Sequence, residues 1–261
     1  MNSEMKQTKL IIMGLLFCFM MNIKAFSADK TSFTIGWEPW MPYQYTNDQK
    51  QLTGLDVELV KAIIHEMNCT LTYTKLPWLR SLAFVKQGRM DLVAGASKTL
   101  ERQEYAYFSN PYRNESNVMF VLKGTANIYP FKHLSDIINT RFQLGITNGY
   151  YYGETFAELL KNPAFKKHIQ GVPSDMINIK KTLRNRVNGF IGDIYAGIAS
   201  LKKEDVRDKF EIHSVPVSSA KIHIMFSKKS CKQNDVVRFN KALNRLQKNG
   251  HLKSIVKKYT E

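Results

Sequence analysis

Short apolar runs alternate with segments of helical periodicity along most of this chain, and this alternation constrains the fold more than any other feature. The first series holds a strand at Phe33–Gly36, apolar residues at helical spacing from Val57 to Met67, a strand at Cys69–Thr74 and a helix at Trp78–Gln87. Strands that alternate with helices are typical of βαβ units, in which helices cover a parallel sheet. The chain is therefore predicted to be an α/β protein.

A second series of the same kind follows Tyr112. Its predicted strands lie at 117–122, 142–146, 189–191 and 222–227. Its predicted helices lie at 153–161, at 176–186 and from 194 onward. The chain shows no internal repeat and no low-complexity segment. The roughly 230 residues beyond the N-terminal segment are too many for one small core and suit two lobes of about a hundred residues each.

The N-terminus has the pattern of a secretory signal peptide. Lysines precede an apolar run at Leu10–Met21, and the small residues Ala25 and Ser27 suit a cleavage site. The apolar run is shorter than the ~20 residues that a membrane span needs. We expect removal of residues 1–27 and export to the periplasm, with an uncleaved anchor as the alternative. The bulky residue before Cys18 argues against a lipidation signal.

The exported chain is strongly basic. The full chain carries a formal charge of +16, and removing three lysines and one glutamate with the signal peptide leaves +14. Much of the excess follows Lys221, where only Asp235 and Glu261 oppose it. A basic patch can serve nucleic acid, an anionic lipid surface or an acidic ligand. Export argues against nucleic acid, so we interpret these lysines as solvated helix faces, with docking to a membrane partner as the alternative.

Cysteine and histidine usage gives no sign of a metal site. Cys69 and Cys231 remain after processing, and an exported chain can oxidise them, so a disulfide between the two stays open. The six histidines are scattered and match no metal-ligand spacing. We expect neither a metal nor a cofactor.

One segment, Gly88–Tyr112, has the layout of a ligand site. An apolar run ending in glycine predicts a buried parallel strand, and the hydroxyls of Ser97 and Thr99 are placed to cap a helix that opens at Leu100. Arg102 then lies one turn inside that helix. A guanidinium beyond the carboxyl end of a strand can hold a carboxylate through two parallel hydrogen bonds. The alternative is a capped surface helix with a solvated arginine.

The same segment also carries a family resemblance, which continues along the chain. The matching stretches are PWLRSLAFVKQGRMDLV, FSNPY, WEPWMPY (37–43), GLDVELVKAI (54–63), FQLGITNGY (142–150), RVNGFIGD (186–193) and FNKALNRLQKNGHLKSIVKKY (239–259). In this order they resemble the bacterial family 3 extracellular solute-binding proteins, the periplasmic receptors of polar amino acid ABC importers.

The resemblance implies a type II periplasmic-binding-protein fold of the Venus-flytrap kind, with two α/β lobes and two hinge crossings. It places residues 28–112 and 221–261 in the first lobe and residues 113–220 in the second, inserted lobe. Such a hinge closes over a ligand that contacts both lobes at once.

The resemblance also assigns residues to the ligand. Arg102 matches the arginine that clamps the α-carboxylate, and Ser97 and Thr99 match positions that present polar groups to the same carboxylate, although Thr99 could be only a helix cap. Asp193 matches the acidic residue that accepts bonds from the α-ammonium, and its alternative role is to cap the helix beginning at Ile194.

Aromatic residues complete the predicted site. Trp40 and Trp78 match positions where an aromatic ring packs on the ligand side chain. Tyr150, with the two tyrosines after it, stands where the family has small hydroxyl residues at a helix mouth. A larger, flatter or more anionic solute than an ordinary polar amino acid would use these tyrosines better, so Tyr150 is counted among the ligand-binding residues.

The sequence thus predicts a monomeric, non-enzymatic receptor that captures a small carboxylate-bearing solute, an amino acid or a relative, and delivers it to an ABC permease in the inner membrane. One alternative is an enzyme resembling cyclohexadienyl dehydratase, for which Glu38 or Asp193 could supply an acid or base. The other is a ligand sensor for a membrane signalling partner.

Overall fold

The computed structural model describes residues 29–260, and residues 31–261 form one compact unit. The expected signal peptide and Cys18 lie outside the described residues. The strands are β1 (Ser32–Trp37), β2 (Tyr45–Thr46), β3 (Leu52–Thr53), β4 (Thr70–Lys75), β5 (Leu92–Ser97), β6 (Ala106–Phe108), β7 (Arg113–Leu122), β8 (Leu144–Thr147), β9 (Ile169–Val172), β10 (Gly189–Asp193) and β11 (Phe210–Ser227).

The α-helices are α2 (Leu55–Glu66), α3 (Trp78–Gln87), α4 (Leu100–Tyr105), α5 (Glu154–Leu159), α6 (Pro163–Lys166), α7 (Asp175–Leu183), α8 (Ile194–Lys203), α9 (Gln233–Lys248) and α10 (His251–Thr260). Short 3₁₀ helices are η2 (Ala126–Ile128), η3 (Leu134–Asn139) and η4 (Arg207–Lys209). None of the helices in the described part of the chain is both long and apolar enough to cross a membrane.

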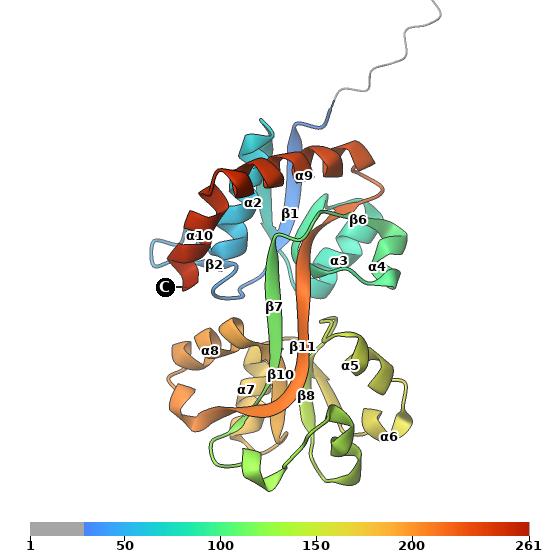
Figure 1. Cartoon of the computed structure of the whole chain (residues 1–261), viewed down its shortest axis with the longest axis vertical. Helices are drawn as coiled ribbons and strands as arrows, with labels where there is room; N and C mark the ends of the chain where they lie inside the picture. The colour runs from blue at the N-terminus through green and yellow to red at the C-terminus, as the bar shows by residue number, and fades with distance from the viewer. Residues whose placement is uncertain (1–28, 261) are drawn as a thin grey trace, which may run out of the picture. The chain divides into compact units, whose positions relative to one another are not determined.

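Two α/β lobes share one continuous sheet with the order β4-β1-β5-β11-β7-β10-β8-β9, and β6 pairs with β11. Lobe one holds β1, β4, β5 and β6 with helices α2, α3, α4, α9 and α10, and lobe two holds β8 to β10 with α5 to α8 (Figure 1). In lobe one, β1 lies parallel to both β4 and β5, as the βαβ pattern of the sequence predicts. The two-lobed α/β fold is confirmed.

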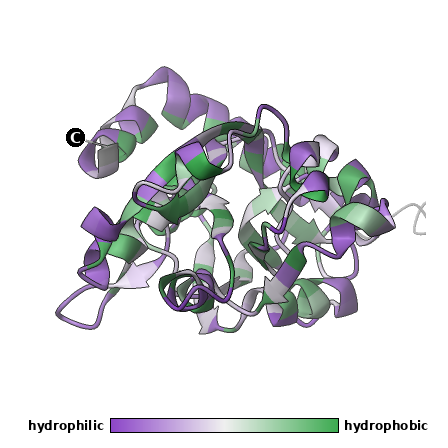
Figure 2. Cartoon of the chain, turned by 90° about the horizontal axis from the view of Figure 1, so that it is seen from below, coloured by the Kyte–Doolittle hydropathy of each residue, from purple (hydrophilic) through white to green (hydrophobic). Residues whose placement is uncertain are grey.

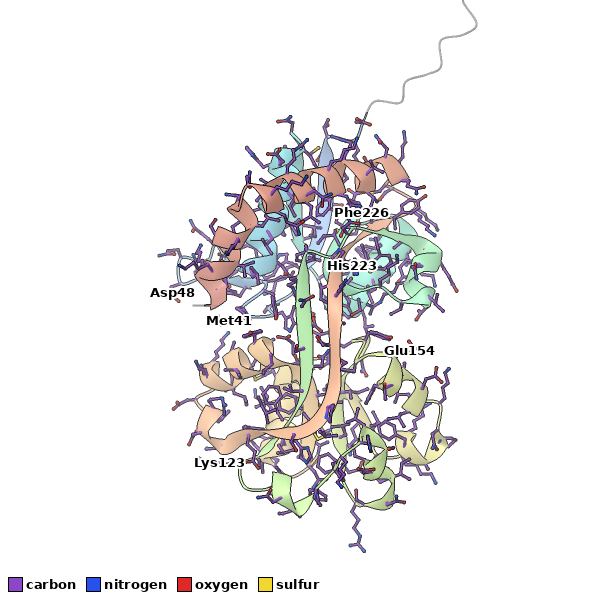
Figure 3. All side chains as sticks on the ribbon, in the orientation of Figure 1. Met41, Asp48, Lys123, Glu154, His223 and Phe226 are labelled. Atoms are coloured by element: carbon purple, nitrogen blue, oxygen red, sulfur yellow. The ribbon has the colours of Figure 1, made fainter. Side chains whose placement is uncertain are left out.

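Two long strands connect the lobes. β7 and β11 run antiparallel to each other from lobe one into lobe two, with an irregularity between His213 and Ser218. Figure 3 labels Lys123, just beyond β7, in lobe two, and Phe226, on β11, in lobe one. The sequence predicts shorter strands at 117–122 and 222–227; both extend further because each crossing supplies the other's hydrogen-bond partners. The predicted lobe boundaries at 112 and 221 stay a prediction, since unbroken strands run through them.

Each lobe has its own apolar core. In lobe one, residues from β1, α2 and β11 pack with α9, and this cluster includes Phe33, Leu59, Ile63, Phe226 and Phe239. In lobe two, a second cluster includes Phe142, Leu144, Phe156, Phe165 and Ile191. The C-terminal helices α9 and α10 pack on α2, and hydrophilic residues line their outer faces (Figure 2). The basic C-terminal residues therefore lie on amphipathic helices of lobe one.

The two cysteines are not disulfide-bonded in the structure. Cys69 lies with its Sγ 3.3 Å from Nη2 of Arg238, whereas Sγ of the buried Cys231 lies 3.8 Å from the carbonyl oxygen of Asp91. The two thiols thus have separate surroundings in lobe one.

Candidate functional site

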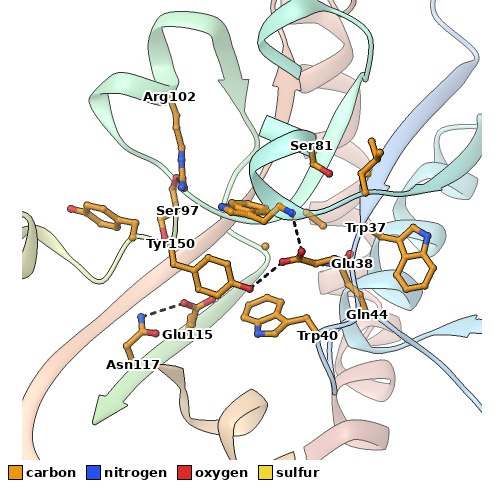
Figure 4. A pocket seen from close by; sticks show the side chains of 16 residues that line it. Trp37, Glu38, Trp40, Gln44, Ser81, Ser97, Arg102, Glu115, Asn117 and Tyr150 are labelled. Carbon is orange, nitrogen blue, oxygen red and sulfur yellow. Dashed lines mark hydrogen bonds between the residues drawn. The ribbon is translucent and has the colours of Figure 1, made fainter. Parts of the chain in front are cut away.

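A cavity lies where lobe one meets β7 and the loop that follows β8. Five aromatic side chains line it, Trp37, Trp40, Trp78, Tyr150 and Tyr151. Its polar lining residues are Glu38, Gln44, Ser81, Ser97, Arg102, Glu115 and Asn117 (Figure 4). The rings leave a free volume of only about 40 Å³, which suits a few water molecules rather than an amino acid.

The turn between β5 and α4 positions Arg102. Thr99, in an extended conformation, caps α4 by accepting a bond from the backbone N–H of Arg102 at 3.2 Å. Arg102 is buried, with only 6% of its surface exposed, and its guanidinium donates to the carbonyl oxygens of Ser97 at 3.0 Å and Gly149 at 2.9 Å. Burial lowers the pKa of this guanidinium, which still stays charged. The cavity therefore contains a cation that reaches from lobe one to lobe two.

Trp78, the first residue of α3, shares the Gly149 contact. Its indole Nε1 donates to the Gly149 carbonyl oxygen at 3.0 Å, and the Arg102 guanidinium lies 5.5 Å from its ring centroid. Tyr150 packs edge-on against both Trp78 and Trp40, with centroid distances of 6.1 and 6.2 Å. Trp78, Tyr150 and Trp40 thus form one contiguous wall, in the favoured edge-to-face arrangement.

Two carboxyl groups enter the cavity. Glu38 accepts bonds from the backbone N–H of Trp78 at 2.8 Å and from the Tyr150 hydroxyl at 3.2 Å (Figure 4). Burial raises the pKa of Glu38, and these two bonds offset part of that rise. Burial raises the pKa of the Glu115 carboxyl to about 7, so this group is partly protonated at neutral pH.

Buried polar atoms in the cavity wall lack partners. Among the described residues, Trp40 Nε1 and Ser81 Oγ are buried without a hydrogen bond. A buried polar group without a partner is unfavourable by about 1–3 kcal/mol, and a bound water molecule or a polar atom of a ligand can satisfy it. Both atoms belong to residues that line the cavity.

Five of the seven residues predicted from the sequence line the cavity, namely Ser97, Arg102, Trp40, Trp78 and Tyr150. Thr99 and Asp193 are not among its lining residues. Thr99 serves α4 as its cap. Asp193 caps α8 through the Ala196 N–H at 2.9 Å and accepts a bond from the Tyr43 hydroxyl at 2.9 Å. The roles of all seven in binding stay predictions.

Several lining residues were not among those predicted. Glu115 and Asn117 lie two apart on β7, so their side chains share one face of the strand. Residues 113–117 are all polar and show no apolar alternation, so the predicted strand begins only at Asn117 and the shared face is not apparent from the sequence. Gln44 and Ser81 have no sequence signal beyond their polarity. Within residues 29–260, no group of three or more His, Cys, Asp or Glu side chains is arranged to hold a metal ion.

Comparisons with known proteins identify the family of the chain. The family model of the bacterial extracellular solute-binding proteins, family 3, matches residues 33–261. The arginine-binding extracellular protein ArtP of Bacillus subtilis strain 168 is 27% identical over 221 residues, which cover 84% of this chain and 82% of ArtP. The probable amino-acid-binding protein YxeM of the same organism is 25% identical over 221 residues, or 84% of this chain and 79% of YxeM.

A solved structure extends the likeness to the fold. The crystal structure of a histidine kinase sensor domain with similarity to periplasmic binding proteins matches with a TM-score of 0.76 at 16% identity, covering 88% of this chain and 96% of that domain. At this identity the match shows a shared fold only.

Proposed function

This chain belongs to the bacterial extracellular solute-binding proteins, family 3, and we therefore propose that it is a periplasmic receptor for a small carboxylate-bearing solute. The solute is an amino acid or a relative, bound between the lobes and delivered to an ABC permease of the inner membrane. Two Bacillus relatives whose names specify amino acid or arginine binding support the solute class.

The single observation that carries the proposal is the position of Arg102. Its guanidinium is buried in the cavity and donates to a carbonyl of each lobe. A buried guanidinium favours an anionic partner, because its planar donors match the two oxygens of a carboxylate. A solute carboxylate that reaches Arg102 is therefore in contact with the elements that close on it, and such contacts favour closure.

A thermal-shift screen of the mature protein tests this function. The panel contains amino acids, small peptides, dicarboxylates and aromatic acids, and a bound solute raises the melting temperature. We expect at least one carboxylate to produce a shift and Arg102→Ala to abolish it. Arg102→Lys keeps the charge but not the paired donors, so a reduced shift is expected in that variant.

Arg80→Ala is the matched control, because Arg80 is an exposed arginine of α3 that does not line the cavity. It should leave the shift unchanged. An undiminished shift in a folded Arg102→Ala variant would contradict the carboxylate clamp. Turnover of prephenate or arogenate by the purified protein would instead favour the enzyme, for which Glu38 is a cavity carboxyl whose pKa is raised by burial, as Glu115 is too.

A further inference from the structure

Gly149 of lobe two makes contacts in the cavity that resemble those of a ligand. Its carbonyl oxygen accepts two hydrogen bonds from lobe one, from Arg102 Nη2 at 2.9 Å and from Trp78 Nε1 at 3.0 Å. Two bonds use both lone pairs of a carbonyl oxygen. Under the proposed function, the same N–H groups of Arg102 and Trp78 would donate to an oxygen of the solute carboxylate.

The backbone at Gly149 is suited to this close approach. Its φ is +78°, a conformation that favours glycine, and a Cβ at this position would clash with Cδ2 of Leu79 on α3. The turn is fixed to the end of β8 by the bond from the Tyr150 N–H to the Thr147 carbonyl at 3.2 Å. The carbonyl of Gly149 in lobe two thus faces the first turn of α3 with no side chain of its own in between.

The next residue supplies a second ligand-like group. The Tyr150 ring packs edge-on between Trp40 and Trp78, and its hydroxyl donates to Glu38 Oε1 at 3.2 Å. The other Glu38 oxygen accepts the Trp78 N–H, which fixes the carboxylate at the end of this aromatic slot. The slot therefore accepts a flat ring that carries a hydrogen-bond donor.

We propose that Gly149 and Tyr150 act as a built-in ligand that the solute must displace, and that the solute carries a carboxylate and an aromatic ring with a hydrogen-bond donor. This inference rests on the proposed receptor function and narrows its solute class. The small free volume of the cavity follows from the same contacts, because the Tyr150 ring fills the slot. The solute takes over the Arg102 and Trp78 donors with its carboxylate and reaches Glu38 with its ring donor.

The three tryptophans of the chain all line this cavity, so ¹⁵N-tryptophan labelling gives three indole signals that all report on the site. We expect Tyr150→Ala to shift the Trp78 and Trp40 signals before any solute is added. Titration with L-tyrosine should then show binding at least about tenfold tighter than in the unaltered protein, because the competing ring is gone. Tyr150→Phe, which loses only the bond to Glu38, should give a smaller gain.

Tyr195→Ala is the control, since Tyr195 lies on α8, is 56% exposed and does not line the cavity. Its signals and affinities should match those of the unaltered protein. A second arm compares 4-hydroxyphenylacetate with phenylacetate, which differ only in the ring donor. The hydroxylated acid should bind more tightly, and Glu38→Gln should reduce that difference.

The outcomes separate the two proposals. If Tyr150→Ala leaves the Trp78 and Trp40 signals unchanged, or weakens the binding of carboxylates, Tyr150 is not a competitor and the built-in ligand is refuted. If Tyr150→Ala improves binding of L-arginine but not of L-tyrosine, the aromatic solute class is wrong while the competitor stands. If the signals shift in Tyr150→Ala but no carboxylate binds any variant, the proposed receptor function is refuted, and the result supports only the contacts of Tyr150 with the two tryptophans.

Discussion

Arg113, the first residue of β7, is a buried cation beside the cavity. Its guanidinium donates from two nitrogens to both oxygens of Asp56, at 2.7 and 3.1 Å, and lies 3.8 Å from the Tyr43 ring centroid. It also lies 3.5 Å from the Glu115 carboxylate. Because its charge is already balanced by Asp56, Arg113 does not fully offset the desolvation of Glu115, and the pKa of Glu115 stays high.

Glu115 should make stability depend on pH. Its pKa is about 7 in the folded chain and close to 4.5 in the unfolded chain, so the folded state retains the proton over a wider pH range. The free energy of unfolding should therefore fall by about 3 kcal/mol between pH 4.5 and pH 8 through this group alone. Urea unfolding of Glu115→Gln across this range should show a correspondingly smaller fall than the unaltered protein.

The control for this measurement is Glu101→Gln, which changes an exposed glutamate of α4. It should follow the pH dependence of the unaltered protein. Identical pH profiles for Glu115→Gln and the unaltered protein would mean that Glu115 is ionised and well solvated in the folded chain.

The sequence predicted the strand–turn–helix segment that brings Ser97 and Arg102 to the cavity wall, whereas Thr99 of the same segment does not line the cavity. Ser97, Thr99 and Arg102 belong to one strand–turn–helix segment, whose cap and buried strand follow from neighbouring residues. Asp193 was predicted to face a ligand or cap a helix, and the structure shows the cap. Glu115 becomes a cavity residue only because β7 crosses between the lobes, which nearby residues do not encode.

At the scale of elements, α4 depends on its cap. It has only six residues, so few helical hydrogen bonds hold its first turn, and the Thr99 hydroxyl supplies one acceptor. Thr99→Ala should lower the free energy of unfolding by about 1 kcal/mol, whereas Thr99→Ser should restore most of it. Chemical denaturation measures both.

The same variants separate capping from binding. Because Thr99 does not line the cavity, Thr99→Ala should change solute affinity far less than Arg102→Ala does. A loss of affinity equal to that of Arg102→Ala, without loss of stability, would instead assign Thr99 to the ligand.

Most elements with strong periodicity were predicted correctly, and the helix at Trp78–Gln87 has the predicted bounds. The long strands were the main error. Residues 113–117 and 218–221 are mostly polar, with no apolar alternation, and they are strands because they pair with each other. Pairing between segments about a hundred residues apart is a tertiary effect that overrides local propensity.

At the scale of the whole molecule, the two crossings form one hydrogen-bonded ribbon. Asn114 to Asn117 pair with Ser218 to Lys221, so lobe motion must bend this ribbon rather than rotate two independent loops. Amide hydrogen exchange should therefore be slow at these positions, as in the core strands, and fast in the exposed turn at residues 48–51. Exchange of the ribbon as fast as in that turn would indicate a locally unfolded hinge.

The family resemblance drawn from the order of the motifs is confirmed by the match over residues 33–261. The order of the motifs predicts the fold, because each motif lies at a turn or a strand end and the topology of the whole chain sets the order of these turns and strand ends. The same motifs predict the identity of the solute less well. Gly149 contacts Arg102, and Tyr150 contacts Glu38, only because the fold brings the two lobes together.

The place of β11 in the sheet has a consequence for the order in which the chain can fold. β11 pairs with β5 and β6 on one side and with β7 on the other, and α9 and α10, which follow it, cover α2. The core of lobe one, which contains the first strands of the chain, is therefore complete only when the last fifty or so residues have been added. Lobe two is nearly contiguous in sequence and can form early, so the strands and helices of lobe one that precede β7 complete their core last.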